Sequence, residues 1–175
     1  MGAEQENLRR IAFAVGGGAL GALLVQSRHD ELKKSCAERD DPEGVAWLCE
    51  LIGDLLDEWA PRNYDTEDAY TQALYRFLNR RIPEELEDGD EVEVELWPTT
   101  ECGVPDILIN DQLVLELKLA PDKGGRDRGI GQCADYSREW VTWMVVIGSP
   151  AREIDALEEL LAARGLDGIK IMSFT

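Results

Sequence analysis

The stretch GVPDILINDQLVLELKL, residues 103–119, decides the fold that we expect for this chain. Two apolar runs, 104–109 and 113–119, flank Asn110-Asp111-Gln112, whose residue types favour turns. This pattern predicts a β-hairpin. Both faces of its strands are largely apolar, which indicates that the sheet is covered on both sides.

The alternation of side chains within this hairpin brings three charged groups together. A three-residue loop places Asp106 directly opposite Glu116, and Lys118 then lies on the same face as both carboxylates. A two-residue loop would shift the register by one residue and turn Asp106 to the other face.

Two carboxylates side by side in a partly dry site repel each other unless a cation lies between them. Mg²⁺ is such a cation, because it takes oxygen ligands and is usually held by one or two carboxylates. Lys118 would orient or deprotonate a water, or offset the charge of a phosphoryl transition state. The pattern therefore favours a phosphodiesterase site, and the alternative is an ordinary Glu/Lys pair on a solvated strand.

Two further segments carry polar side chains that would reach the hairpin. Upstream, Asp65 or Thr66 is expected to cap a helix whose first turn carries Glu67 on the core-facing stripe. Downstream, another expected helix carries Gln132 and Tyr136 four residues apart, on one face.

The order of these motifs resembles the PD-(D/E)XK nuclease superfamily, in particular the members with a Gln-x-x-x-Tyr motif in bacterial recombination helicase-nucleases. The resemblance covers residues from about 65 to the C-terminus. It implies an α/β fold, an α/β/α sandwich with a mixed central sheet of the restriction-endonuclease type, and Mg²⁺- or Mn²⁺-dependent hydrolysis of DNA.

The resemblance also implies roles for individual residues. Asp106 and Glu116 become metal ligands, Lys118 the catalytic lysine, and Glu67 an accessory acid that also reaches the metal. Gln132 and Tyr136 become substrate-positioning groups. Some members of the family have a histidine in the first helix, and this chain has none there, so Gln72 competes with Glu67 for that role.

Length and composition limit the other possibilities. A chain of 175 residues suffices for one α/β core, and we expect a nuclease-like domain over 63–175 preceded by a helical extension over 1–62. Its four cysteines are scattered without CxxC spacing, which indicates neither a zinc site nor a disulfide framework, and a reducing, cytoplasmic location is expected. With His29 as its only histidine, the chain does not suit a Ser-His-Asp enzyme.

The net charge of −18 opposes DNA binding, since affinity for DNA rests largely on basic side chains that neutralise phosphates. A salt-rich cytoplasm, a basic partner, or basicity confined to the site would each resolve this conflict. Residues 123–138 support the third solution, because Lys123, Arg126 and Arg128 lie there as candidate phosphate contacts. The glycines of this segment predict a mobile loop, which ends where a helix starts at Gly131. The alternative is a solvated loop with mixed charges.

The N-terminal third contains an uncharged, glycine-rich run over 11–25 and an amphipathic pattern over 45–60. As a helix the first run would reach ~22 Å, at about 1.5 Å per residue, which is short of the ~30 Å core of a membrane. A packing or dimer-forming helix is favoured over a membrane tether or a secretion signal. Homodimerisation or docking of a partner protein is expected through these helices.

The remaining pattern predicts a charged helix over 31–39, a turn over 40–44, and a half-buried strand near 92–96 with an acidic outer face. It continues with a buried strand over 141–148, a helix over 151–164 and a last strand over 169–174. The leading hypothesis is a DNA nuclease acting in genome defence or repair. The alternatives are a non-catalytic nucleic-acid-binding or scaffold subunit of the same fold, and a membrane-tethered enzyme.

Overall fold

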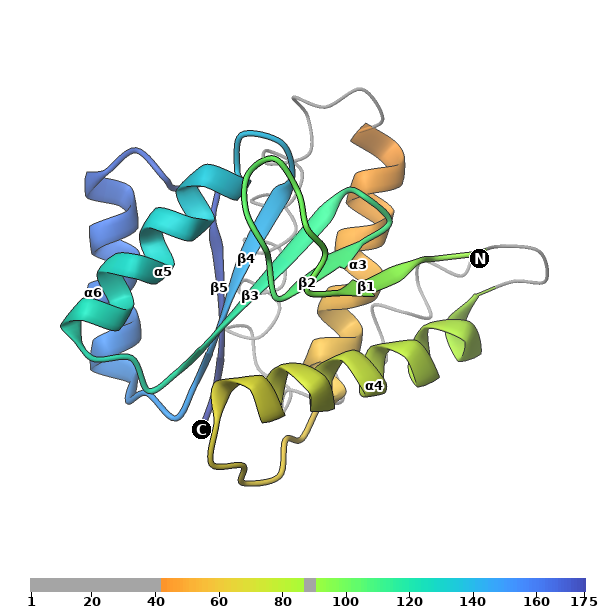
Figure 1. The fold of residues 1–175 in the computed structure, drawn as a ribbon, viewed down its shortest axis with the longest axis horizontal. Coiled ribbons are helices and arrows are strands. Elements are labelled where there is room, and N and C mark those ends of the chain that lie inside the picture. The colour runs from red at the N-terminus through yellow and green to blue at the C-terminus, as the bar shows by residue number, and fades with distance from the viewer. Residues whose placement is uncertain (1–41, 87–90) are drawn as a thin grey trace, which may run out of the picture.

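The computed structural model describes residues 42–86 and 91–175 as a mixed α/β structure (Figure 1). These residues form four helices and a five-stranded mixed sheet. The helices are α3 (Pro42–Glu58), α4 (Glu67–Glu85), α5 (Lys123–Tyr136) and α6 (Ala151–Ala163). The strands are β1 (Val94–Leu96), β2 (Ile107–Ile109), β3 (Leu113–Leu119), β4 (Val141–Ile147) and β5 (Lys170–Phe174). The helices expected over 11–25 and 31–39 lie outside the described residues.

The strands follow one another across the sheet in chain order, β1-β2-β3-β4-β5. Strands β1, β2 and β3 are antiparallel, and β3, β4 and β5 are parallel. Ile109 pairs with Leu113, which confirms the three-residue loop of the hairpin. Asn110 and Asp111 have φ values of 54° and 49°, a region that these two residue types tolerate well.

Helices cover both faces of the sheet (Figure 1). On one face, α3 and α4 pack against the side chains of β2, β3 and β4 that include Ile107, Leu115 and Trp143. On the other face, Ile130 of α5 and Leu157 of α6 belong to a second apolar cluster with β4. Every residue of β4 is buried, as expected for a strand covered on both sides.

Several boundaries agree with the sequence pattern to within a residue or two, namely those of β3, β4, β5 and α6 and the start of α4. Other expectations were wrong. The strand expected from Val104 begins at Ile107, and the turn expected over 40–44 is already helical from Pro42, a residue that suits the first turn of a helix. Helix α3, expected within the helical extension over 1–62, contributes Leu48 and Leu56 to the same apolar cluster as the sheet.

The prediction of a mobile loop over 123–130 was also wrong, because this segment forms the first half of α5. Asp122 caps the helix, and its side chain accepts a hydrogen bond from Gly125 N at 2.7 Å. Ile130 and Cys133 then anchor the helix against the sheet. This packing outweighs the low helix propensity of the glycines.

No helix in the described ranges is both long enough and apolar enough to cross a membrane. The run over 11–25, on which a membrane tether depends, lies outside those ranges.

Candidate functional site

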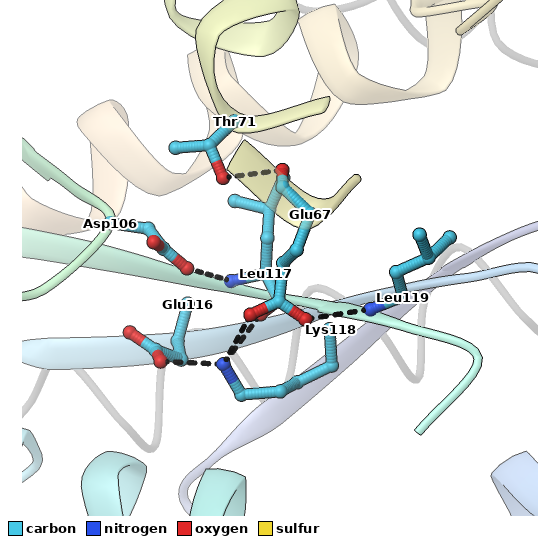
Figure 2. A network of polar contacts seen from close by, with 7 residues as sticks. All are labelled: Glu67, Thr71, Asp106, Glu116, Leu117, Lys118 and Leu119. Atoms are coloured by element: carbon cyan, nitrogen blue, oxygen red, sulfur yellow. Dashed lines mark hydrogen bonds and ion pairs between the residues drawn. The ribbon is translucent and has the colours of Figure 1, made fainter. Parts of the chain in front are cut away.

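The site lies where β2 separates from β3. The strands pair only as far as Ile107 and Leu115, and beyond this point the backbone N–H groups of β3 are taken up by carboxylates (Figure 2). Leu117 N donates to Asp106 Oδ2 at 2.7 Å, and Leu119 N donates to Glu67 Oε2 at 2.9 Å. These carboxylates accept the hydrogen bonds that a continuing strand β2 would otherwise accept. They thereby avoid the free-energy cost of unpaired buried N–H groups.

Lys118 joins the acidic groups into one network (Figure 2). Its Nζ donates to Glu116 Oε1 at 2.8 Å, to Glu67 Oε1 at 3.1 Å and to the Leu117 carbonyl at 2.7 Å. An ammonium has three donors, so all are used. Glu116 is only 2% exposed and Lys118 7%.

Glu67 reaches this network from the first turn of α4. Thr66 caps the helix by accepting from Ala69 N at 3.2 Å, and Thr71 Oγ1 donates to the Glu67 carbonyl. These contacts fix the start of the helix beside the end of β3. Of the two candidates in α4, Glu67 is the one whose side chain hydrogen-bonds residues of β3, namely Lys118 and Leu119.

Burial dominates the electrostatics of the carboxyl groups. It raises the pKa of Glu116 to about 7, and the neighbouring Asp106 adds to this effect while Lys118 opposes it. Burial also raises the pKa of Asp106, partly offset by the hydrogen bond from Leu117.

Burial acts on the pKa of the Lys118 ammonium in the opposite direction. Burial lowers the pKa of Lys118, but Glu116, Glu67 and Asp106 together raise it by a larger amount, so its pKa lies above the ordinary value. Lys118 is therefore a cation, and the three carboxyl groups of Glu67, Asp106 and Glu116 surround it.

A pocket of about 730 Å³ opens onto this network. Its lining includes Glu67, Asp106, Glu116 and Lys118 together with residues of α5 and of the loop that precedes it. Glu116 Oε2 is buried and has no hydrogen-bond partner among the described residues. Such an orphaned oxygen beside a second carboxylate suits a bound cation.

The donor set fits Mg²⁺ better than a metal that needs a full protein cage. Across 42–86 and 91–175, no group of three His, Cys, Asp or Glu side chains converges as a metal site. Asp106 and Glu116 offer two carboxylates, and Mg²⁺ commonly fills its other positions with water and phosphate oxygens. Both oxygens of Glu67 contact Lys118 or Leu119, and its direct ligation of metal stays a prediction.

The residues predicted to bind substrate separate into two groups. Arg128 and Gln132 of α5 line the pocket. Lys123 is exposed at the first residue of α5, while Arg126 lies 3.5 Å from Glu153 of α6 and so faces a different neighbour.

Tyr136 lies behind the pocket wall rather than on it. It is 2% exposed and packs with Leu108 and Val114. A Cβ at Gly103 would lie 3.4 Å from the Tyr136 hydroxyl, so the loop before Asp106 rests on this ring. Burial raises the pKa of Tyr136 to about 12, which keeps its hydroxyl protonated.

Two residues at the site were not predicted from the sequence. A Cβ at Gly129 would lie 3.1 Å from Lys118 Cε, so this glycine of α5 leaves room for the lysine side chain. Trp97 N donates to the Asp106 carbonyl at 3.0 Å, and the Trp97 side chain lowers the pKa of the Asp106 carboxyl, against the larger effect of burial. The glycines over 124–131 were a usable signal for the close approach of Gly129 to Lys118. Nothing in the sequence indicated the contact between Trp97 and Asp106.

Comparison of this chain with protein families, with curated proteins and with solved structures gave no match. The proposal for its function therefore rests on the chemistry of the site and on the order of its motifs.

Proposed function

We propose that this chain is a Mg²⁺- or Mn²⁺-dependent nuclease that hydrolyses phosphodiester bonds in DNA. The observation that carries the proposal is the buried, unpartnered Oε2 of Glu116, beside Asp106 and Lys118 in a solvent-accessible pocket. In the proposed fold the two helical layers and the sheet form an α/β/α sandwich like that of restriction endonucleases. The earlier resemblance to the PD-(D/E)XK superfamily is part of this proposal.

The side chains divide the work according to their charges. Asp106 and Glu116 would hold the metal ion. The ion, when bound, would polarise the scissile phosphate and lower the pKa of a water. Lys118, held as a cation by its carboxylate neighbours, offsets negative charge that develops on the phosphate.

Glu67 acts through Lys118. It accepts from Nζ and also from the backbone of Leu119, so the ammonium is fixed relative to β3. A fixed ammonium needs little reorganisation when charge develops nearby, which is the property that favours catalysis.

Arg128 and Gln132 would contact the substrate from α5. They line the same pocket as the carboxylates and would meet a phosphate that is bound there. In a chain with a net charge of −18, Arg128 and a bound metal ion would together supply the positive charge that attracts a polyanion to this pocket. Tyr136 supports this wall from behind and is a positioning residue in the proposal.

A non-catalytic nucleic-acid-binding or scaffold subunit is the second candidate. It is favoured by the backbone contacts of Asp106 and Glu67, which stabilise β3 whether or not any reaction takes place. Such a protein would bind DNA or a partner and leave phosphodiester bonds intact.

Incubation with labelled DNA separates the two candidates. Linear and circular substrates, single- and double-stranded, are incubated with Mg²⁺, Mn²⁺ or EDTA at low and high salt. We expect cleavage with metal, none in EDTA and none by Lys118→Ala. Arg152→Ala, which removes one exposed positive charge on α6, serves as the matched control and should cleave normally.

Binding without cleavage under every condition would favour the scaffold instead. Full activity of Lys118→Ala, or cleavage that persists in EDTA, would contradict the assigned site.

A further inference from the structure

The large hydrophobic side chains that are exposed in the described ranges are Trp47, Trp97 and Val104. Trp47 is on α3, and the other two flank Asp106 in the structure. Val104 is 49% exposed and lines the pocket, and Trp97 is 37% exposed and donates its backbone N–H to the Asp106 carbonyl. Apolar surface is therefore presented to solvent beside the network of Glu67, Glu116 and Lys118.

The backbone holds Trp97 in place. Its φ of 50° lies in the left-handed region, which a bulky residue rarely adopts. The following loop is closed by reciprocal hydrogen bonds between Thr100 and Gly103, at 2.8 and 3.3 Å. A strained residue persists only where its surroundings fix it, and an exposed tryptophan fixed beside an acid site indicates a surface kept for contact.

We propose that Trp97 stacks on an unpaired base of the nucleic acid, so that the site acts on single-stranded or unpaired nucleotides. This inference rests on the proposed nuclease function and names its substrate class. An aromatic ring stacks readily on any exposed base face, whereas the bases of an intact duplex already stack on one another. Val104 would extend the apolar contact, while Arg128 and Gln132 meet the phosphates within the same pocket.

Stacking also suits the charge of this chain. Affinity gained from phosphate contacts depends on basic side chains, which are few relative to the acids here. A base held on an aromatic ring adds affinity without neutralising phosphates. A single strand is thereby recognised by its bases at a site whose surroundings are acidic.

The test compares a short oligothymidylate with an abasic strand of the same length, bound in EDTA so that no cleavage occurs, by fluorescence anisotropy. Wild type should prefer the thymidylate at least about fivefold, which corresponds to the lower end of measured base–aromatic stacking. Trp97→Asn should reduce this preference to less than about twofold, since asparagine tolerates the left-handed φ but has no ring. Trp97→Phe should restore it.

Trp47→Asn is the matched control, because it removes an exposed tryptophan from α3 and should leave the preference unchanged. An undiminished preference in Trp97→Asn overturns the inference, and so does a blunt duplex that competes as well as the single strand. Lack of binding to either strand also overturns it. Cleavage of DNA by wild type with Mg²⁺ then shows separately whether the proposed nuclease function survives.

Discussion

Replacing Glu116 by glutamine should stabilise the metal-free protein at neutral and alkaline pH. Burial raises the pKa of Glu116 from an ordinary 4.5 to about 7. The folded protein therefore binds more protons than the unfolded chain between these two values, and its free energy of unfolding falls as the pH rises through them. The difference, at 1.36 kcal/mol per pKa unit, amounts to about 3 kcal/mol above pH 7.

Glu116→Gln removes this titration while preserving the shape of the side chain. Its amide oxygen can still accept from Lys118 Nζ, which also keeps Glu67 and the Leu117 carbonyl as acceptors. Part of the attraction to Lys118 is lost, so we expect a net gain of about 1–3 kcal/mol at pH 8 and little difference near pH 4.

Denaturant unfolding in EDTA at pH 4, 6 and 8 measures this difference. Glu159→Gln, at an exposed position on α6, removes the same charge and should change stability little at any pH. A variant that is no more stable than wild type at pH 8, or whose gain does not depend on pH, would refute the reasoning from burial.

Three further predictions concern neighbouring residues. Mg²⁺ or Mn²⁺ should raise the melting temperature of wild type by binding only the folded state, and Asp106→Asn should abolish that rise; an equal rise in both proteins would exclude the site. A Cβ added at Gly131 has no atom within 4 Å, so Gly131→Ala should raise the free energy of unfolding by about 0.5–1 kcal/mol in denaturant. Gly129→Ala should show no such gain and should lose most cleavage, because its methyl group would meet Lys118 at 3.1 Å. Arg128→Ala should weaken DNA binding and flatten the slope of log affinity against log salt by about 0.7–0.9, and Arg126→Ala, which contacts Glu153, should leave the slope unchanged; the reverse pattern would place the phosphate contact elsewhere.

The hairpin was predictable because two local signals agree. Strand alternation fixed which side chains share a face, and Asn110 and Asp111 favour the left-handed turn that sets the register. The side of Asp106, Glu116 and Lys118 followed from that register. The cap of α4 was equally local, since Thr66 needs only the first turn of its own helix.

The misplaced elements depend on contacts between distant parts of the chain. Helix α5 contains glycines that locally oppose a helix, and the packing of Ile130 and Cys133 decides its conformation. The apolar stripe of α3 indicated a buried face, but not that this face packs on the sheet. Trp97 reaches Asp106 through an irregular loop for which no periodicity exists.

The dependence of DNA cleavage on Mn²⁺ concentration tests the central claim most directly. Initial rates on labelled single-stranded DNA are measured for wild type, Asp106→Asn and the control Glu159→Gln, alongside the Mn²⁺ concentration that half-saturates the rise in melting temperature. We predict that wild type and control become active at the concentration that stabilises the fold, and that Asp106→Asn stays inactive. Metal-independent cleavage, or the same Mn²⁺ dependence in Asp106→Asn, would contradict a metal-dependent nuclease centred on Asp106 and Glu116.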